Sequence, residues 1–154
     1  MPTIIYEILI DAPIDLCFDL SRDVAIHTQT TGKTKEKAVG GKVKGLLEKG
    51  DSVTWEATHF GVRQRLTAKI IEMDKPHTFR DVMVSGAFHS FTHTHQFSRQ
   101  ENGTLVRDEF VYRSPLGILG RLADLLFLEK YMTNFIKRRS LELKRIAESI
   151  ESKS

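Results

Sequence analysis

The strongest constraint in this sequence is the stretch 51–114, in which apolar and polar side chains alternate. Four segments of this stretch follow a period of two residues, which is the side-chain repeat of a β-strand. Short turn signals accompany them at positions 60–61, 74–77, 85–87 and 100–103. Connections this short join neighbouring strands that run in opposite directions, so the sequence predicts an antiparallel meander.

The turns also predict which residues face each other across neighbouring strands. A two-residue turn at Phe60-Gly61 places His59 opposite Val62, with Ala57–Gln64 and Trp55–Leu66 following along the same pair of strands. The later turns predict the pairs Met73–Thr78, Ile70–Asp81, Ala68–Met83, Met83–Phe91, Asp81–His93, Arg99–Thr104, Phe97–Val106, His95–Asp108, His93–Phe110 and Phe91–Tyr112.

This register separates the side chains by polarity. One face of the sheet collects Val53, Trp55, Ala57, Val62, Leu66, Ala68, Ile70, Phe79, Met83, Phe91, Phe97, Val106, Phe110 and Tyr112. The other face collects Thr54, Glu56, Arg63, Arg65, Lys69, Arg80, Arg99, Arg107, Glu109 and Arg113. A slip of one residue would exchange the faces, so the agreement of separate turns on one apolar face supports the register.

Other elements flank the meander. Residues 4–10 are rich in β-branched and aromatic types and predict a strand. Short helices are expected at 13–23, which starts at a proline, and at 24–29. A long helix is expected over 118–151, where apolar residues recur with helical spacing, and its first half is apolar on more than one side. That half is therefore expected either to be deeply buried or to cover another part of the protein, and the whole arrangement is α+β.

The size and composition are those of one intracellular domain. With 154 residues, the chain (1–154) fits a single domain that folds without disulfides, and it contains one cysteine, Cys17. No apolar stretch approaches the ~20 residues that a membrane span needs. The start, Met1-Pro2-Thr3, has no basic region typical of a signal peptide. We therefore expect a soluble cytoplasmic protein.

Positive charge is concentrated between Lys33 and Lys49, where six lysines stand against two glutamates, a local net charge of +4. One interpretation is a solvated edge strand whose lysines prevent pairing between sheets. The other is an electrostatic contact with an anionic membrane, an acidic partner or an anionic ligand group. Nucleic acid is not expected as a partner, because no basic face with interleaved aromatic residues is present.

The apolar face also contains polar residues, which are Gln64, Asp81, His89, His93, His95 and Asp108, with His59 near its edge. Buried polar groups without partners are costly, so these residues either pair across strands or border a water- or ligand-filled space. The opposed pairs His95–Asp108 and His93–Asp81 have the right chemistry to bond. Three interpretations compete: hydrogen-bonding groups that orient a ligand, a His–Asp general base, or a metal site formed by His93-Thr94-His95 with His89 or an aspartate.

The sequence resembles the START-like (SRPBCC) superfamily, which includes pollen-allergen-like proteins, polyketide cyclases and lipid-transfer domains. The resemblance rests on Ile8, on 10–13 with the amphipathic helix that follows, on the meander and on the long final helix. A bacterial ligand-binding subgroup of unassigned role is similar in more detail, at 54–57, 59–62, 79–81, Gly86, Phe88, Phe91, His93, His95, Phe97 and 114–117.

This resemblance implies a helix-grip fold, in which a seven-stranded sheet wraps around the C-terminal helix and encloses a hydrophobic cavity. No catalytic motif of the enzymes in the superfamily is reproduced, so no catalytic residue is assigned. We expect no cofactor and no metal, and no particular oligomeric state is predicted.

The leading functional prediction is binding or carriage of a small hydrophobic ligand, such as a lipid, an isoprenoid or a polyketide-like aromatic compound. The alternative is a cyclase- or dehydratase-type enzyme that uses a His–Asp pair to transfer a proton. The predicted ligand-binding residues are Trp55, Gln64, Leu66, Asp81, Met83, Phe91, His93, His95, Asp108, Phe110, Tyr112, Leu122, Leu126 and Met132.

Overall fold

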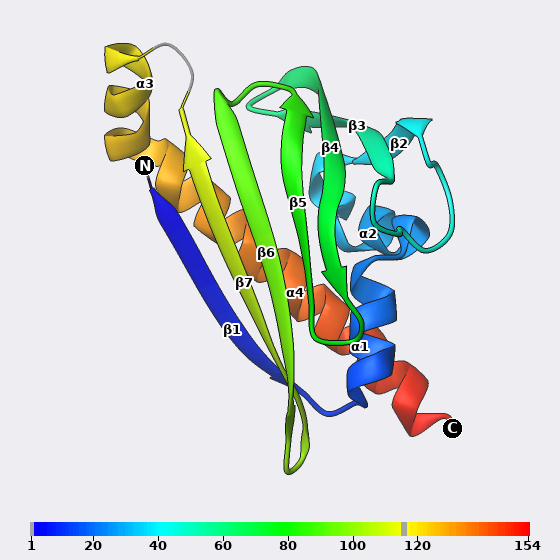
Figure 1. The fold of residues 1–154 in the computed structure, drawn as a ribbon. Helices are drawn as coiled ribbons and strands as arrows, with labels where there is room; N and C mark the ends of the chain where they lie inside the picture. The colour runs from blue at the N-terminus through cyan, green and yellow to red at the C-terminus, as the bar shows by residue number, and fades with distance from the viewer. Residues whose placement is uncertain (1, 115–116) are drawn as a thin grey trace.

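A curved antiparallel sheet and one long helix dominate the computed structural model, which describes residues 2–114 and 117–154 (Figure 1). The side chains at positions 33, 120, 121, 124 and 125 are outside this description, as is the predicted strand stop at 115–116. The elements are β1 (Thr3–Ile10), α1 (Ile14–Ser21), α2 (Val24–Thr30), a 3₁₀ turn (Gly32–Thr34), β2 (Lys37–Gly41), β3 (Ser52–His59), β4 (Val62–Asp74), β5 (Thr78–Ser85), β6 (Ser90–Gln100), β7 (Gly103–Arg113), α3 (Ile118–Ala123), a π-helical turn (Asp124–Leu128) and α4 (Glu129–Ser152).

The described strands form one seven-stranded sheet in the order β1-β7-β6-β5-β4-β3-β2. Helix α4 crosses one face of this sheet, and α1 and α2 pack against α4 (Figure 1). The α+β helix-grip fold is therefore confirmed, including the short helices after the first strand. The count of four strands in the meander was wrong, because the four turns separate five strands, β3 to β7.

Most of the predicted register is confirmed. The β3–β4 turn has two residues, and His59 pairs with Val62. Phe60 and Gly61 have φ values of 51° and 75°, the left-handed conformation that a tight two-residue hairpin requires. The β6–β7 pairs agree throughout, including His95 with Asp108. Between β4 and β5, Ile70 pairs with Asp81 as predicted, but Met73 pairs with Phe79 and not with Thr78, because a bulge lies between Ile70 and Glu72.

The β6–β7 turn requires a glycine at position 103. Its φ is +139°, and a Cβ atom at this position would lie 2.1 Å from the carbonyl oxygen of Ile10. No side chain fits in that space, so glycine allows the end of β1 to approach the start of β7.

The apolar face of the sheet forms the core with α1 and α4. One cluster contains Phe18, Phe79 and Phe97, and a second contains Phe91, Phe110 and Met132. Two residues assigned to this face were placed wrongly. Val62 is 58% exposed beside the tight turn, and His89 is exposed in the β5–β6 connection, because the sheet ends before either residue can reach the core.

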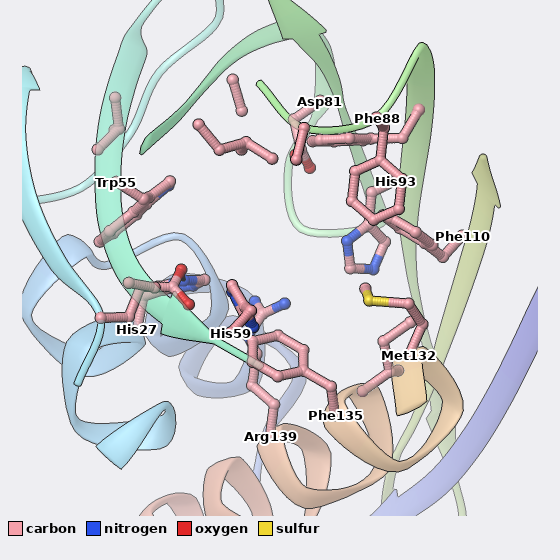
Figure 2. A pocket seen from close by; sticks show the side chains of 18 of the residues that line it. His27, Trp55, His59, Asp81, Phe88, His93, Phe110, Met132, Phe135 and Arg139 are labelled. Atoms are coloured by element: carbon pink, nitrogen blue, oxygen red, sulfur yellow. Dashed lines mark hydrogen bonds and ion pairs between the residues drawn. The ribbon is translucent and has the colours of Figure 1, made fainter. Parts of the chain in front are cut away.

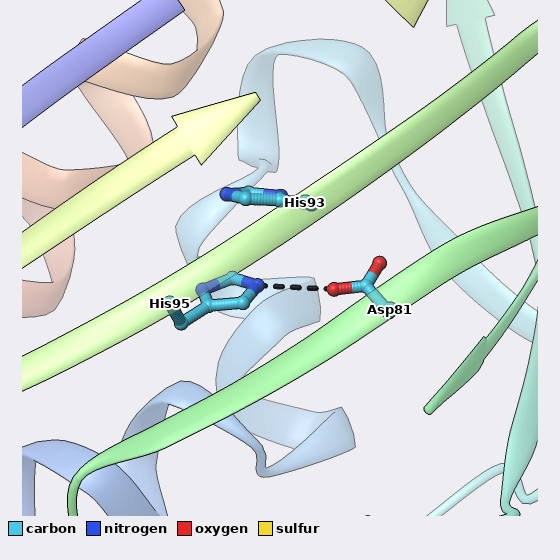
Figure 3. Close-up of side chains that lie close together, drawn as sticks. All are labelled: Asp81, His93 and His95. Carbon is cyan, nitrogen blue, oxygen red and sulfur yellow. Dashed lines mark hydrogen bonds and ion pairs between the residues drawn. The ribbon is translucent and has the colours of Figure 1, made fainter. Parts of the chain in front are cut away.

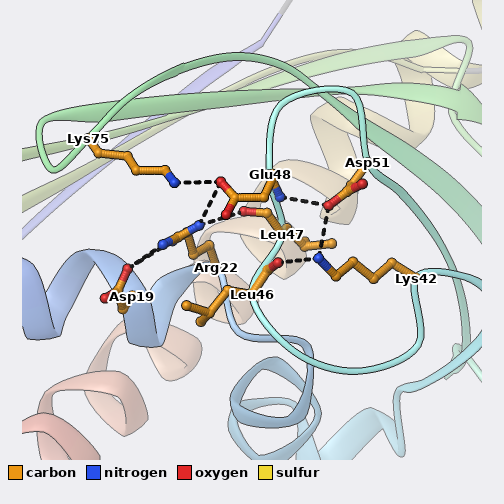
Figure 4. Close-up of polar contacts among 8 residues, drawn as sticks. All are labelled: Asp19, Arg22, Lys42, Leu46, Leu47, Glu48, Asp51 and Lys75. Carbon is orange, nitrogen blue, oxygen red and sulfur yellow. Dashed lines mark hydrogen bonds and ion pairs between the residues drawn. The ribbon is translucent and has the colours of Figure 1, made fainter.

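The segment between Lys33 and Lys49 contains β2, which is an edge strand of the sheet as the first interpretation expected. The following loop is held in place (Figure 4). The Lys42 ammonium donates to the Leu46 carbonyl oxygen at 2.6 Å and contacts Asp51 at 3.2 Å. Buried Arg22, which directly follows α1, donates to the Leu47 carbonyl oxygen at 3.0 Å and pairs with Glu48. Contact with an anionic membrane or an acidic partner stays a prediction.

The start of the C-terminal helix differs from the expectation of deep burial. Ile118 is 83% exposed and Leu119 is 68% exposed, and α3 projects beyond the sheet (Figure 1). The π-helical turn at Asp124–Leu128 inserts an extra residue into the helical repeat, so the apolar stripe of α4 does not continue inward through α3. No helix in the described part of the chain is long and apolar enough to cross a membrane.

Candidate functional site

A cavity of about 340 Å³ lies between the sheet and α4 (Figure 2). Its wall is mostly apolar, and the apolar lining residues are Leu47, Val53, Trp55, Ala57, Phe60, Leu66, Ala68, Ile70, Phe79, Ala87, Phe88, Phe91, Phe110, Leu128, Met132, Phe135 and Ile136. The polar lining residues are Ser21, His27, Glu36, Asp51, His59, Gln64, Arg65, Asp81, His93, His95, Tyr131 and Arg139. An apolar space with a few polar groups is typical of a site for a small molecule.

The structure brings nine of the fourteen predicted site residues to this cavity, namely Trp55, Gln64, Leu66, Asp81, Phe91, His93, His95, Phe110 and Met132. Two others are packed in the wall behind it: Met83 lies against the second core cluster, and Tyr112 has no exposed surface. Asp108 lies behind the two histidines and does not line the cavity itself.

Leu122 and Leu126 were assigned to the site wrongly, since they are 51% and 67% exposed. Both precede α4, on the segment that projects beyond the sheet (Figure 1). Their helical spacing from Met132 fits a continuous α-helix, and the π-helical turn breaks that spacing.

Two histidines and two aspartates form a buried network in the cavity wall. The His93 Nε2 atom lies 2.9 Å from Asp108 Oδ1, and His95 Nδ1 lies 3.0 Å from the same oxygen. The second ring nitrogen of His95, Nε2, lies 3.1 Å from Asp81 Oδ1. The expected bond between His95 and Asp108 is therefore present. His93 bonds Asp108 in place of Asp81, although Asp81 is its register neighbour.

This network shifts the pKa values of the two histidines in opposite directions. Burial lowers the pKa of His93, and the neighbouring His95 lowers it further. Burial also opposes charge on His95, but hydrogen bonds to Asp108 and Asp81 outweigh it and raise the His95 pKa. Burial disfavours ionised Asp108, yet the hydrogen bonds from both histidines keep its pKa well below the ordinary value. These shifts favour the protonated form of His95, which lies between two carboxylates, and the unprotonated form of His93 beside it.

A second polar group lies across the cavity. His27 of α2 lies with its Nε2 atom 2.6 Å from Glu36 Oε1, and its ring stacks on Trp55 with centroids 4.0 Å apart. His59 Nδ1 lies 2.6 Å from the Tyr131 hydroxyl. The sequence analysis missed the contribution of His27 and Glu36, because helix α2 and the segment before β2 meet only in the tertiary structure.

Arg139 reaches the same cavity from α4 (Figure 2). Among the described residues, no hydrogen bond or ion pair to its guanidinium is found within bonding distance, although it influences the pKa of Glu36 and Asp81. The sequence contains a pattern that could have placed Arg139 at the cavity, because it lies on one helical stripe with Met132, Phe135 and Ile136. The sequence analysis did not include Arg139 among the candidate site residues.

The buried polar side-chain atoms all have hydrogen-bond partners in the described part of the chain. Pairing across strands therefore accounts for the polar residues on the apolar face, and the cavity lies beside them. These polar residues therefore pair with other groups and also border a cavity, as the two explanations from the sequence expected.

The pKa of His27 predicts a pH effect on stability. Burial holds this pKa below the ordinary value, against the opposing attraction of Glu36 and Asp81 and with a contribution from Arg139. Between the unfolded pKa of ~6.5 and the lower folded pKa, the unfolded chain binds a proton that the folded chain does not. Stability is therefore lost as the pH falls through this window.

We expect His27→Gln, which can still donate to Glu36, to show a smaller fall in melting temperature between pH 7.5 and pH 5.5 than the parent protein. Thermal unfolding followed by circular dichroism at both pH values tests this. His77→Gln is the control, because His77 lies in the β4–β5 turn outside the cavity. An equal fall in parent and variant would contradict the assignment of a neutral, buried His27.

The structure is similar to several solved proteins. TTHA0849 from Thermus thermophilus aligns with a TM-score of 0.79 and 20% identity over 99% of this chain and 100% of its own. Major latex-like protein 151 from Panax ginseng aligns with a TM-score of 0.70 and 14% identity over 95% and 97% of the two chains. The di-domain ARO/CYC StfQ from the steffimycin biosynthetic pathway aligns with a TM-score of 0.78 and 10% identity over 97% of this chain and 52% of its own.

The chain therefore shares the fold of these proteins, a curved antiparallel sheet that grips a long C-terminal helix, and this is the fold that the sequence resemblance implied. At identities of 10–20% the likeness establishes the fold, and a fold alone does not assign an activity. No protein-family model matches the chain, and no protein of curated function matches its sequence.

Proposed function

We propose that this protein binds or carries a small hydrophobic molecule, such as a lipid, an isoprenoid or a polyketide-like aromatic compound. The observation that carries this proposal is the cavity of about 340 Å³, whose wall is mostly apolar and lies inside the fold. A space of this size is within the range of pockets that hold small organic ligands. An apolar ligand is favoured in such a cavity, because its binding removes apolar surface from water.

The polar wall residues orient such a ligand. Arg139 presents a guanidinium that no described residue pairs with, and this group donates hydrogen bonds to an oxygen atom of a ligand. Gln64 contributes a carboxamide and His93 a neutral imidazole at the same cavity. The ligand proposed here therefore has an apolar body and at least one carbonyl, hydroxyl or carboxylate oxygen.

Fluorescence of Trp55 tests the binding. Trp55 is the only tryptophan in the sequence, it lines the cavity, and it stacks on His27. Titration with oleate and with anilinonaphthalene sulfonate is expected to give a saturable change in its emission. Native mass spectrometry of freshly purified protein provides the second readout, as a bound small molecule.

A pair of variants shows whether the cavity is the site. Ala68 lines the cavity, and Lys69 is the next residue and points to the exposed face of the sheet. We expect Ala68→Phe to weaken binding at least tenfold, because the ring occupies cavity volume, and Lys69→Phe to leave binding unchanged. Equal affinities in the two variants, or no saturable signal and no bound molecule in the parent, would contradict the proposal.

A proton-transfer enzyme of the cyclase or dehydratase type is the second candidate. The network favours it in one respect, since His93 is neutral and bonds Asp108 through one ring nitrogen at 2.9 Å. An imidazole held in this way by a carboxylate can act as a general base through its other nitrogen. His93 suits this role better than His95, whose two nitrogens both lie at carboxylates. If the protein is an enzyme, His93→Gln is expected to abolish turnover while ligand affinity is retained. This result distinguishes an enzyme from a carrier.

A further inference from the structure

Three side chains that can bind a metal ion meet in the cavity wall (Figure 3). Asp81 comes from β5, and His93 and His95 come from β6, the neighbouring strand. One donor atom from each residue lies within 4.8 Å of the other two. All three residues line the cavity, so an ion bound here is accessible from that space.

Asp108 orients both histidines from behind. Its Oδ1 atom lies 2.9 Å from His93 Nε2 and 3.0 Å from His95 Nδ1, and its Oδ2 atom accepts a hydrogen bond from the Ser140 hydroxyl at 3.3 Å. Asp108 thereby occupies one nitrogen of each ring. The other nitrogen of His95, Nε2, faces the proposed ligand Asp81, so the donors to an ion are His93 Nδ1 and, once Asp81 also turns to the ion, His95 Nε2. Metal-binding histidines characteristically donate their second N–H to a carboxylate in this way, which fixes the ring and strengthens the ligand.

The charges of the cluster also suit a cation. With both imidazoles neutral, Asp81 and Asp108 give the cluster two negative charges, and a divalent ion balances them. In the metal-free protein, His95 Nε2 lies 3.1 Å from Asp81 Oδ1 and carries the proton of that hydrogen bond. A metal ion takes the place of this proton, which is released to solvent.

We propose that Asp81, His93 and His95 bind a divalent first-row transition-metal ion such as Zn²⁺, with Asp108 holding both histidine rings and the remaining coordination positions facing the cavity. Two imidazoles and one carboxylate are a ligand set of zinc and iron(II) sites that keep open positions. The sequence-based expectation of no metal rested on the weakness of an isolated His-x-His pattern. The structure adds to that pattern a carboxylate, Asp108, that contacts both histidine rings.

Binding of one ion by these three residues requires their side chains to reorient. Ligand atoms about 2.0–2.2 Å from a zinc ion stand roughly 3–3.5 Å apart, and His95 Nε2 and Asp81 Oδ1 are already at 3.1 Å. The two imidazole rings are stacked, with centroids 3.9 Å apart and an angle of 25° between the planes. Their in-plane lone pairs are therefore nearly parallel, so both rings and the Asp81 side chain must rotate to direct the donor atoms, now up to 4.8 Å apart, at one ion.

The test is a titration of the full chain, first freed of metal by chelator dialysis, with Zn²⁺ against a chromogenic competing chelator. We expect one ion per chain with micromolar or tighter affinity. Asp81→Asn and His95→Gln are expected to weaken binding at least 100-fold, and Asp108→Asn is expected to weaken it by about 10–100-fold, the usual effect of losing a carboxylate behind a metal ligand. His89→Gln is the matched control, because His89 is exposed and only four residues before His93.

Co²⁺ gives an independent readout, since its visible absorption reports nitrogen and oxygen ligands in the parent protein. Thermal unfolding identifies any variant that does not fold, and if His95→Gln is such a variant, the half-buried Asp81→Asn decides the question. The proposal is overturned if the parent protein binds no stoichiometric Zn²⁺, or if Asp81→Asn binds it as the parent and His89→Gln do. The oleate titration is repeated in the presence of chelator. Oleate binding without metal would show that the ligand-binding proposal stands even if the metal proposal fails.

Discussion

Replacing Asp108 by alanine is expected to lower the free energy of unfolding by about 3–5 kcal/mol, the cost of breaking a buried charge pair by removing one partner. Asp108 is 6% exposed, and its carboxylate contacts His93, His95 and Ser140. The alanine side chain leaves these donors without their acceptor inside the core. His95 then retains only Asp81 as a carboxylate partner.

Urea denaturation of Asp108→Ala measures this loss, and Glu109→Ala is the matched control. Glu109 is the next residue on β7, with a side chain 36% exposed that pairs with Arg107 at 3.2 Å. Exposed pairs of this kind contribute at most about 1 kcal/mol. A change below about 1.5 kcal/mol for Asp108→Ala would mean that water enters and replaces the carboxylate.

Replacing Phe18 by alanine is expected to destabilise the protein by about 3–5 kcal/mol, as is usual for a buried phenylalanine. Phe18 of α1 is 1% exposed, and its ring packs edge-on against Phe79 and Phe97, with centroids 5.5 and 5.3 Å away. The substitution removes the ring that joins α1 to strands β5 and β6, and it leaves a void that the close-packed core cannot fully fill.

The control for Phe18→Ala is Val84→Ala, which trims a side chain that is 59% exposed at the end of β5. Surface changes of this type usually alter stability by less than about 0.5 kcal/mol. Melting temperatures of both variants test the expectation. Similar values for the two would show that α1 is not part of the cooperative core.

The sheet was accessible from sequence because its signals are local. The two-residue turn at Phe60-Gly61 fixed the register of β3 and β4, and the turn ending at Gly103 fixed β6 and β7. Where the register failed, at Met73, a bulge adds one residue to β4. No pattern of apolar and polar residues signals a bulge when the faces beyond it remain consistent.

The site was accessible only in part. Strand alternation assigned Trp55, Phe91 and His93 to the inner face, and the structure places all three at the cavity. Alternation specifies a face and not a partner, so His93 was matched with its register neighbour Asp81 and instead contacts Asp108. Side chains on a twisted sheet reach diagonally across strands, and their rotamers are set by packing.

The sequence by itself determined the order of strands in the meander, the face on which most strand residues lie and the presence of a long C-terminal helix, because each of these depends on neighbours a few residues apart. Only the tertiary structure decided that His27, Glu36 and Arg139 share a cavity wall and that Leu122 and Leu126 do not. These outcomes depend on how α2 and α4 lie against the sheet and on one π-helical turn. Burial against distant segments sets such placements, and no short-range pattern encodes them.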